Sequence, residues 1–463
     1  MNLRQRRKNF RRMLRPALAL ASALALCYCF GSCFAAGAEE TDGARPEKQA
    51  SAEAASAQEA GQENEALPAR FCLADQGRKP QVRSQGNTGT CWAICAVSAM
   101  ESDLLPQDQS VFSADHMSLQ NGFRVTQDDG GDYYMIMSYL ADWKGPVLEE
   151  EDPYGDGVSP EGLKAAVHVQ EIRLLQEMSR DTVKRMILRY GALQSSLCMD
   201  RARTDTDEYH YYNALTCAYF DPLMEDVDHD ILILGWDDTF SRDNFRIRPP
   251  EDGAWICQNT WGESFGDDGI FYVSYEDRNL LRRGGVAYSR IERADNYDHV
   301  YENDSLGWQG RQGYDGYECW FAGAYTAEAD EELRAVGLYS TRPGTTCEVY
   351  VIPRFTGEQD LESFSETPLK CAARAELDTA GYFTIDLDQP VLLDAEQDFA
   401  VVIWIRTEGE TKPVAVEMVK DSFTEPVTLE GRRTWISADG EIWDRTQDVY
   451  RTNVCLKAYT SVR

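Results

Sequence analysis

The hydrophobic pattern of the chain changes near Asn296, and this change divides the sequence into two kinds of fold. Between about residues 68 and 293, helix-like periods come first and strand-like apolar runs come later. The clearest of these segments are residues 94–104, 182–190, 230–238 and 269–275. Helices followed by strands without regular alternation predict an α+β fold with a helical half and a β half. A cleft between two such halves is a usual place for a binding site.

After Asn296 the chain consists of short β-rich runs separated by turn residues, including LRAVGLYST, CEVYVIPRF and FAVVIWIRT. Runs of this length and spacing predict a sandwich or a barrel, and the fold class that we expect is an all-β sandwich of the jelly-roll type. Helical periodicity has nearly vanished there. We therefore predict an α+β domain over residues 68–294 and a β-sandwich domain over residues 295–463.

The first 67 residues belong to neither domain. A basic start, MNLRQRRKNFRRMLRP, leads into an apolar stretch and then small residues, which is the pattern of a secretory signal peptide over residues 1–38. A retained membrane anchor and a lipid-modified Cys33 are alternatives, because about 18 apolar residues are at the lower limit for a span. Residues 39–67, rich in Ala, Glu, Gln and Ser, predict a disordered linker. We expect a secreted or cell-surface protein with no stable membrane span after signal removal.

The net charge of −32 makes the chain strongly acidic. Such a field repels phosphate backbones and anionic lipids, which argues against nucleic acid or a membrane surface as the main partner. Of the thirteen cysteines, Cys27, Cys29 and Cys33 lie in the predicted signal, and none of the other ten forms a CxxC pair. Metal-ligand spacing is therefore absent, and we expect no metal and no cofactor. The pairing of disulfides stays open.

Cys91 follows a glycine-bearing loop in QVRSQGNTGTCWAICAVSAMES and stands at the predicted start of a helix. The helix dipole and free backbone N–H groups stabilise a thiolate at such a place, so we expect a lowered pKa and a nucleophilic sulfur near neutral pH. Gln85 lies six residues upstream and can point its side-chain amide at the same place. Together with the backbone N–H of Cys91, this amide would form an oxyanion hole.

A catalytic thiolate needs a nearby imidazole, and the chain has five histidines. His229 stands at the start of an apolar strand in DVDHDILILGWDD, and its spacing from Cys91 falls within the roughly 130–150 residues expected for one cysteine-protease family. Asn259, in QNTWGESFGDDG, suits the residue that orients the ring, because a thiolate already balances the imidazolium charge. Trp261 can cover the Asn259–His229 hydrogen bond from water, and we group it with the substrate-binding residues. The other four histidines lack such a context.

The blocks QGNTGTCWA, DHDILILGWDD and QNTWGESFGDDG together resemble the papain family of cysteine peptidases, in the order and spacing of that family. The resemblance covers about residues 68–275 and extends to FSADHMSLQNG, GGDYYMIMSYL and EEEDPYG. It implies that Gln85 belongs to the oxyanion hole, that Cys91 is the nucleophile and that Gly130 and Gly131 bind substrate backbone. It also implies that His229 is the base and that Asn259 orients it.

Four positions depart from the pattern of the papain family, namely Thr88, Thr90, Thr260 and Phe265. Thr88 replaces a cysteine of many members, so the disulfide of those members is missing here, but no departure removes a catalytic group. The sequence is most similar to bacterial secreted members that carry a C-terminal lectin-like β domain. NYDHVYENDSLGWQG and GRRTWISADGEIWD resemble that domain.

The resemblance implies a secreted cysteine endopeptidase that acts on protein or peptide substrates through a Cys-His-Asn thiolate/imidazolium pair and an acyl-thioester. Two alternatives stay open. A cysteine amidase or transpeptidase acting on cell-wall peptides would use the same groups, because acyl-thioester formation does not decide whether water or an amine attacks next. A non-catalytic carbohydrate-binding or adhesive surface protein is the other. The side-chain preference of the peptide pocket also stays open.

The C-terminal domain is expected to contribute no catalytic group and to dock either on the catalytic domain or on a surface ligand, for which a glycan is one candidate. Its aromatic side chains could stack on sugars, although tryptophans in a sandwich more often fill the core. Those considered are Trp308, Trp320, Trp435 and Trp443.

Overall fold

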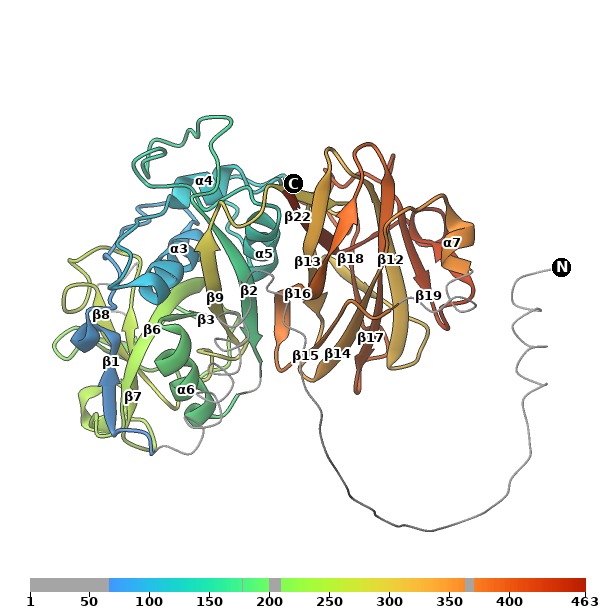
Figure 1. Cartoon of the computed structure of the whole chain (residues 1–463). Coiled ribbons are helices and arrows are strands. Elements are labelled where there is room, and N and C mark those ends of the chain that lie inside the picture. The colour runs from blue at the N-terminus through green and yellow to red at the C-terminus, as the bar shows by residue number, and fades with distance from the viewer. Residues whose placement is uncertain (1–65, 177, 200–209, 363–369) are drawn as a thin grey trace, which may run out of the picture. The chain divides into compact units, whose positions relative to one another are not determined.

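The computed structural model describes residues 66–176, 178–199, 210–362 and 370–463 (Figure 1). The predicted signal peptide and nearly all of the predicted linker lie outside these residues. Residues 66–463 form one compact unit. Within the described ranges, every helix is too short or too polar to cross a bilayer.

Four helices form the helical half of the N-terminal region. They are α3 (Cys91–Leu104), α4 (Ala114–Leu119), α5 (Tyr133–Ala141) and α6 (Arg180–Tyr190), with short 3-10 helices at Leu73–Gln76 and Arg242–Asn244. α3 is buried from Cys91 to Ser102, as expected of a helix that is apolar on every side. Its carboxylate at Glu101 is 3% exposed and accepts a hydrogen bond from Arg83 at 2.6 Å. This ion pair lets α3 run through the centre of the core.

The β half of this region is an antiparallel sheet with one parallel pair at its edge. Its strands are β1 (Arg70–Cys72), β2 (Val167–Leu175), β3 (Leu193–Leu197), β4 (Tyr212–Asn213), β5 (Ala218–Tyr219), β6 (His229–Asp237), β7 (Ala254–Gln258), β8 (Ile270–Ser274) and β9 (Gly285–Arg293). The order is β2-β9-β3-β6-β7-β8-β5-β4, with β1 paired to β6. α3 lies against β6 and β9 (Figure 1). The central helix therefore meets the sheet where β6 begins.

The C-terminal region is a sandwich of β-sheets with two short helices, α7 (Glu358–Glu362) and α8 (Thr446–Val449). Its strands are β10 (His299–Glu302), β11 (Gly310–Gln312), β12 (Glu318–Thr326), β13 (Glu331–Ser340), β14 (Thr345–Ile352), β15 (Ala373–Leu377), β16 (Ala380–Leu393), β17 (Asp398–Thr407), β18 (Val414–Glu417), β19 (Thr434–Ser437), β20 (Trp443–Arg445), β21 (Asn453–Val454) and β22 (Leu456–Val462). One sheet has the order β10-β22-β13-β16, and the facing sheet has the order β15-β14-β17-β12-β19-β20. A three-stranded sheet, β11-β18-β21, completes the region.

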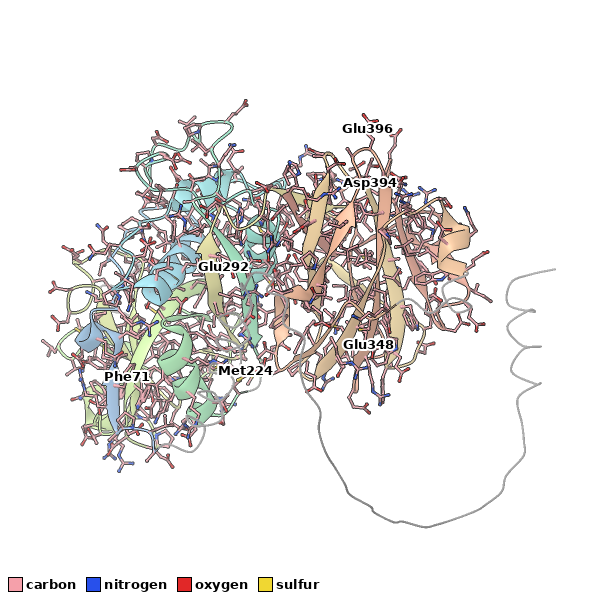
Figure 2. The ribbon with its side chains drawn as sticks, viewed as in Figure 1. Phe71, Met224, Glu292, Glu348, Asp394 and Glu396 are labelled. Carbon is pink, nitrogen blue, oxygen red and sulfur yellow. The ribbon has the colours of Figure 1, made fainter. Side chains whose placement is uncertain are left out.

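Buried side chains of both sheets fill the space between them, and Figure 2 shows the side chains of the chain as sticks. Phe321, Val349 and Ile403 are among the buried residues of this core. Asp394 and Glu396 lie exposed at one end, in keeping with the acidic composition. The α+β fold with a following β-sandwich is thereby confirmed.

The two regions share one sheet. β16 pairs with β2 in an antiparallel register, with Ala380 opposite Leu174 and Tyr382 opposite Ile172. Gly381 lies within this pairing, and a Cβ on it would be 1.9 Å from the backbone oxygen of Ile172, so only glycine fits. The sandwich is therefore joined to the α+β region by backbone hydrogen bonds as well as by packing. The domain limits 68–294 and 295–463 stay predictions.

Candidate active site

The predicted nucleophile lies in the first turn of a helix. α3 begins at Cys91, and the loop before it is held by Tyr154. The Tyr154 hydroxyl contacts the hydroxyls of Thr88 and Thr90 and donates to the backbone oxygen of Gln85 at 3.1 Å. This tyrosine ends the acidic turn EEEDPYG. The turn therefore supports the loop that presents the thiol.

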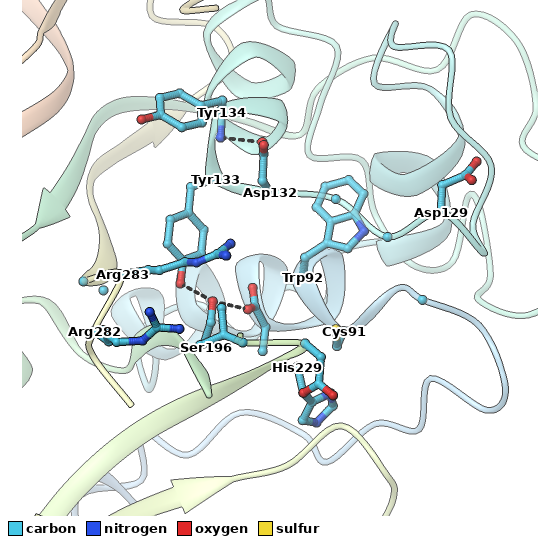
Figure 3. A pocket seen from close by; sticks show the side chains of 18 of the residues that line it. Cys91, Trp92, Asp129, Asp132, Tyr133, Tyr134, Ser196, His229, Arg282 and Arg283 are labelled. Atoms are coloured by element: carbon cyan, nitrogen blue, oxygen red, sulfur yellow. Dashed lines mark hydrogen bonds between the residues drawn. The ribbon is translucent and has the colours of Figure 1, made fainter. Parts of the chain in front are cut away.

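His229 and Asn259 lie together, as the resemblance implies. They stand at neighbouring ends of the paired strands β6 and β7, and Nε2 of His229 is 2.7 Å from Oδ1 of Asn259. Because Nε2 is engaged by Asn259, Nδ1 is the nitrogen that can serve the sulfur of Cys91, which lines the same pocket (Figure 3). The Trp261 ring lies over the imidazole, with ring centroids 4.9 Å apart. Asn259 is 1% exposed, so water does not compete for its bond.

Gln85 lines the pocket beside Cys91, and its side-chain amide is fixed at both ends. Nε2 donates to the backbone oxygen of Thr88 at 2.7 Å, and Oε1 accepts from the Thr260 hydroxyl at 2.7 Å. An amide nitrogen carries two hydrogens, so Gln85 keeps a second N–H for a group bound in the pocket. This geometry suits the oxyanion-hole role that the sequence predicts.

Gly130 and Gly131 lie on the rim of the pocket next to Trp92. Gly130 has a φ of +78°, which favours glycine. A Cβ on Gly131 would lie 2.3 Å from the Trp92 ring, so no side chain fits there. The backbone of this pair consequently stays open to a substrate strand.

The expected lowering of the Cys91 pKa by the helix start is outweighed by burial. Burial raises the pKa of Cys91 to about 12, and the carboxylates of Asp230 and Asp228 raise it as well. Backbone hydrogen bonds from Asp230 and Trp92 lower the pKa without offsetting burial. A thiolate at Cys91 therefore depends on a protonated imidazole beside it, and His229 is the base placed to provide one.

Two known protein families match the two regions of this chain. The family described as papain family cysteine protease matches residues 67–290. The family described as lectin like domain matches residues 300–460. The chain contains a papain-family cysteine protease domain followed by a lectin-like domain. The resemblance to the papain family and to a lectin-like domain, predicted from the sequence, is confirmed.

The protease domain is similar to cysteine proteases of plants and animals. It is 24% identical over 229 residues to the probable cysteine protease RD19B of Arabidopsis thaliana, a match that covers 46% of this chain and 60% of that protein. It is 24% identical over 233 residues to cathepsin S of Bos taurus, covering 48% of this chain and 64% of that protein. The chain thus spans less than two thirds of the length of these relatives.

A solved structure combines both domains. It contains the cysteine protease and lectin-like domains of Cwp84, a surface layer associated protein of Clostridium difficile. The TM-score is 0.73 at 21% sequence identity, over 86% of this chain and 90% of that one. The shared fold therefore includes the order and joining of the protease and lectin-like domains.

The pocket of the protease domain has a volume of about 720 Å³ and extends beyond His229 to residues that the sequence analysis did not single out. The Tyr133 hydroxyl is 2.8 Å from the Ser196 hydroxyl, which in turn donates to Oδ1 of Asp230 at 2.5 Å. Arg282 and Arg283 lie at this same end (Figure 3). This end of the pocket is polar, and it carries both signs of charge.

Asp230 is the buried carboxylate of this group. Burial raises its pKa to about 6, and the hydrogen bonds from Ser196 and Gln194 lower it. Oδ2 of Asp230 accepts from Gln194 at 2.7 Å, and the same amide donates to the backbone oxygen of Trp92 at 3.1 Å. In the sequence, the local sign that Asp230 belongs to the site is its position directly after His229. Ser196 comes from a distant element and has no such sign, whereas Tyr133 stands two residues after Gly131 in the segment GGDYYMIMSYL.

One group of side chains outside the predicted site has the ligand atoms for a cation. The thiol of Cys198 and the carboxylates of Asp221 and Glu225 lie within 4.8 Å of one another. Burial raises the pKa of Cys198 to about 12, and the three carboxylates nearby, those of Asp228, Glu225 and Asp221, raise it too. The thiol donates to Glu225 at 3.7 Å, so a proton already bridges two of these groups. The spacing of these residues gives no metal motif in the sequence.

Proposed function

We propose that the chain is a cysteine endopeptidase that hydrolyses protein or peptide substrates. The observation that carries this proposal is the hydrogen bond between Nε2 of His229 and Oδ1 of Asn259, with His229 and Cys91 lining one pocket. It holds the imidazole with Nδ1 as the nitrogen for the sulfur, which is the arrangement that a thiol nucleophile needs. The match to the papain family supports the same reaction.

In the acylation half of the reaction, Nδ1 of His229 takes the proton of the Cys91 thiol, and the sulfur attacks the carbonyl carbon of the scissile peptide bond. The carbonyl electron pair moves onto oxygen, where the backbone N–H of Cys91 and the second amide N–H of Gln85 stabilise the negative charge. The carbon–nitrogen bond then breaks as the imidazolium gives its proton to the leaving amine. An acyl-thioester on Cys91 remains.

In the deacylation half, His229 takes a proton from water as the water oxygen attacks the thioester carbonyl. The carbon–sulfur bond breaks, the new carboxylic acid leaves, and Cys91 and His229 regain their starting protonation. The cycle consumes one water and involves no oxidation or reduction. An amine in place of water would give the transpeptidase reaction, and an amidase would use water on an amide of a cell-wall peptide, so the products separate these alternatives from the proposed one.

Digestion of a peptide library tests the proposed endopeptidase activity. We expect internal peptide bonds to be cut, with a free carboxylate on one product and a free amine on the other, identified by mass spectrometry. Products in which an added amine has replaced the leaving amine, without hydrolysis, would contradict the proposal. The same library reports the side-chain preference.

The Asn259→Ala variant is expected to lower kcat roughly 10- to 1,000-fold, because the ring loses its orientation while every reacting group remains. Steady-state hydrolysis of a fluorogenic peptide measures kcat. Asn121→Ala is the control, since Asn121 is equally buried but donates to the backbone oxygens of Met117 and Ser118 and not to His229. If both variants keep the kcat of the unchanged protein, the orienting role of Asn259 is wrong.

We further propose that the chain acts at a cell surface and that its lectin-like domain binds a ligand there. Support comes from the fold shared with Cwp84, which is described as surface layer associated. Trp308, Trp435 and Trp443 are only 5–6% exposed and fill the core. Trp320 is half-buried beside Tyr350. A glycan that stacks on one of the four tryptophans considered would therefore bind at Trp320.

A further inference from the structure

Two residues that line the substrate pocket are backed by the lectin-like domain. Tyr134 is the second residue of α5, and its ring meets Trp308 edge-to-face, with centroids 5.1 Å apart and planes at 86°. Leu174 lies near the end of β2, directly opposite Ala380 of β16. Trp308 is 5% exposed and Ala380 is fully buried. The two contacts come from different elements of the lectin-like domain and reach different elements of the pocket.

The helix that carries Tyr134 is also tied to the lectin-like domain further along. The Ser138 hydroxyl donates to the backbone oxygen of Ser305 at 3.1 Å, and Nζ of Lys144 donates to the same oxygen at 2.9 Å. At the end of α5, Asp142 accepts from Nζ of Lys457 at 2.9 Å. The lectin-like domain thus holds α5 near its start, in its middle and at its end.

The start of α5 is also the place where the pocket wall is made. Asp132 caps the helix by accepting from the backbone N–H groups of Tyr134 and Met135. Asp132, Tyr133 and Tyr134 all line the pocket, directly after the substrate-binding pair Gly130 and Gly131 (Figure 3). A shift of α5 therefore moves the pocket wall and the glycine pair together.

β2 is fixed in the same way. Arg173, next to Leu174, pairs with Asp378 at 2.5 Å, and its guanidinium lies 5.2 Å from the centre of the Phe383 ring. Both partners belong to the lectin-like domain. The backbone of β2 next to Leu174 is therefore held by contacts with the lectin-like domain.

We infer that the lectin-like domain is part of the substrate-binding machinery of the protease, with Trp308 as a positioning residue that acts through Tyr134. The inference rests on the proposed peptidase function and adds a residue to its substrate site. Even a small shift of the pocket wall weakens the binding of substrate. Cys91, His229 and Asn259 stand on other elements, so their positions do not change with it. Loss of Trp308 should therefore weaken the binding of extended peptides and spare the chemical step.

The test compares Trp308→Ala with Trp435→Ala. Trp435 is a matched control, because it lies in the same domain and is 6% exposed against 5% for Trp308, but it packs on Phe355 and not on the pocket. We expect Trp308→Ala to raise KM for a peptide of eight residues by about 10-fold and to change kcat by less than about twofold. Trp435→Ala should leave KM unchanged. Equal KM values in the two variants would overturn the inference.

Two further variants keep this test decisive. Trp308→Phe retains an aromatic edge for Tyr134 and should restore KM, whereas a merely space-filling role would be restored equally by Trp308→Leu. If Trp308→Ala does not fold, the comparison of Trp308→Phe with Trp308→Leu is read in its place, and equal KM values again overturn the inference.

Failure of the peptidase proposal is recognised separately. The alkylation rate of Cys91 by iodoacetamide and the hydrolysis by the unchanged chain report on the catalytic groups. If the chain does not hydrolyse the peptide, its affinity is measured by fluorescence anisotropy in the Cys91→Ala background. A dissociation constant that is about ten times larger for Trp308→Ala in the Cys91→Ala background than for Cys91→Ala itself supports the positioning role, and equal constants overturn it.

Discussion

The His229→Ala variant is expected to lose at least about 1,000-fold in kcat/KM, because it loses both the base and the acid of the reaction. It should also lose the thiolate. Burial raises the pKa of Cys91 to about 12, so without a protonated imidazole the sulfur holds its proton at neutral pH. The chain with His229 intact keeps the cation that balances the thiolate.

The pH dependence of Cys91 alkylation measures this effect. A group whose pKa is raised to about 12 loses its proton only as the pH approaches that value, so alkylation of the His229→Ala variant should rise steadily with pH up to the highest pH tested. With His229 present, alkylation should already be rapid near pH 6, and hydrolysis should follow a bell-shaped profile. His210→Ala, at an exposed histidine outside the pocket, should resemble the unchanged chain. Slow alkylation at pH 6 in the unchanged chain would contradict the ion pair.

The Lys457→Met variant is expected to lower the free energy of unfolding by about 3–5 kcal/mol, because it leaves buried carboxylates without their cation. Nζ of Lys457 contacts the carboxylates of Asp142, Glu302 and Asp304, and the lysine is 2% exposed. Burial lowers the pKa of Lys457, but Asp142 and Asp304 outweigh this effect, and its pKa lies well above the usual value. The loss should appear in a single unfolding transition, since Asp142 belongs to the protease domain and Lys457 to the lectin-like domain.

The size of this loss should depend on pH. Burial raises the pKa of Asp304 to about 7, although Lys457 lowers it. A carboxyl group with a raised pKa binds more protons in the folded state, so its contribution to stability falls as pH rises from about 4 toward the folded value. Without Lys457 the pKa of Asp304 is raised further, so this fall continues to higher pH, and the destabilisation should be larger at pH 8 than at pH 5. Urea unfolding at the two pH values measures it, with Lys420→Met at an exposed lysine as control. Equal stabilities of the two variants would contradict the account.

The residues that we propose as catalytic could be singled out because each stands in a local pattern with a chemical reason. Cys91 follows a loop and opens a buried helix, and His229 opens an apolar strand. Asn259 follows a strand that pairs with that one, so the two side chains meet without any long-range information. The fold class followed from hydrophobic periods of the same local kind.

The remaining features depend on contacts between distant segments. Nothing in the pattern of β2 or β16 predicts that they pair, and the contact between Tyr134 and Trp308 joins two separate domains. The polar end of the pocket is likewise assembled from separate elements, as Ser196 and Asp230 show. The raised pKa of Cys91 also depends on burial by the whole domain, which outweighs the lowering by the backbone N–H at the helix start.

The site of reaction with a thiol-directed epoxysuccinyl inhibitor tests the central claim most directly. All ten cysteines of the described residues are unpaired, and Cys217 and Cys371 are more exposed than Cys91, so reactivity set by exposure would label those two first. We predict a mass increase of one inhibitor, peptide mapping to Cys91, and loss of hydrolysis in step with labelling. Loss of activity with Cys91 unmodified and the label on another cysteine would contradict the account.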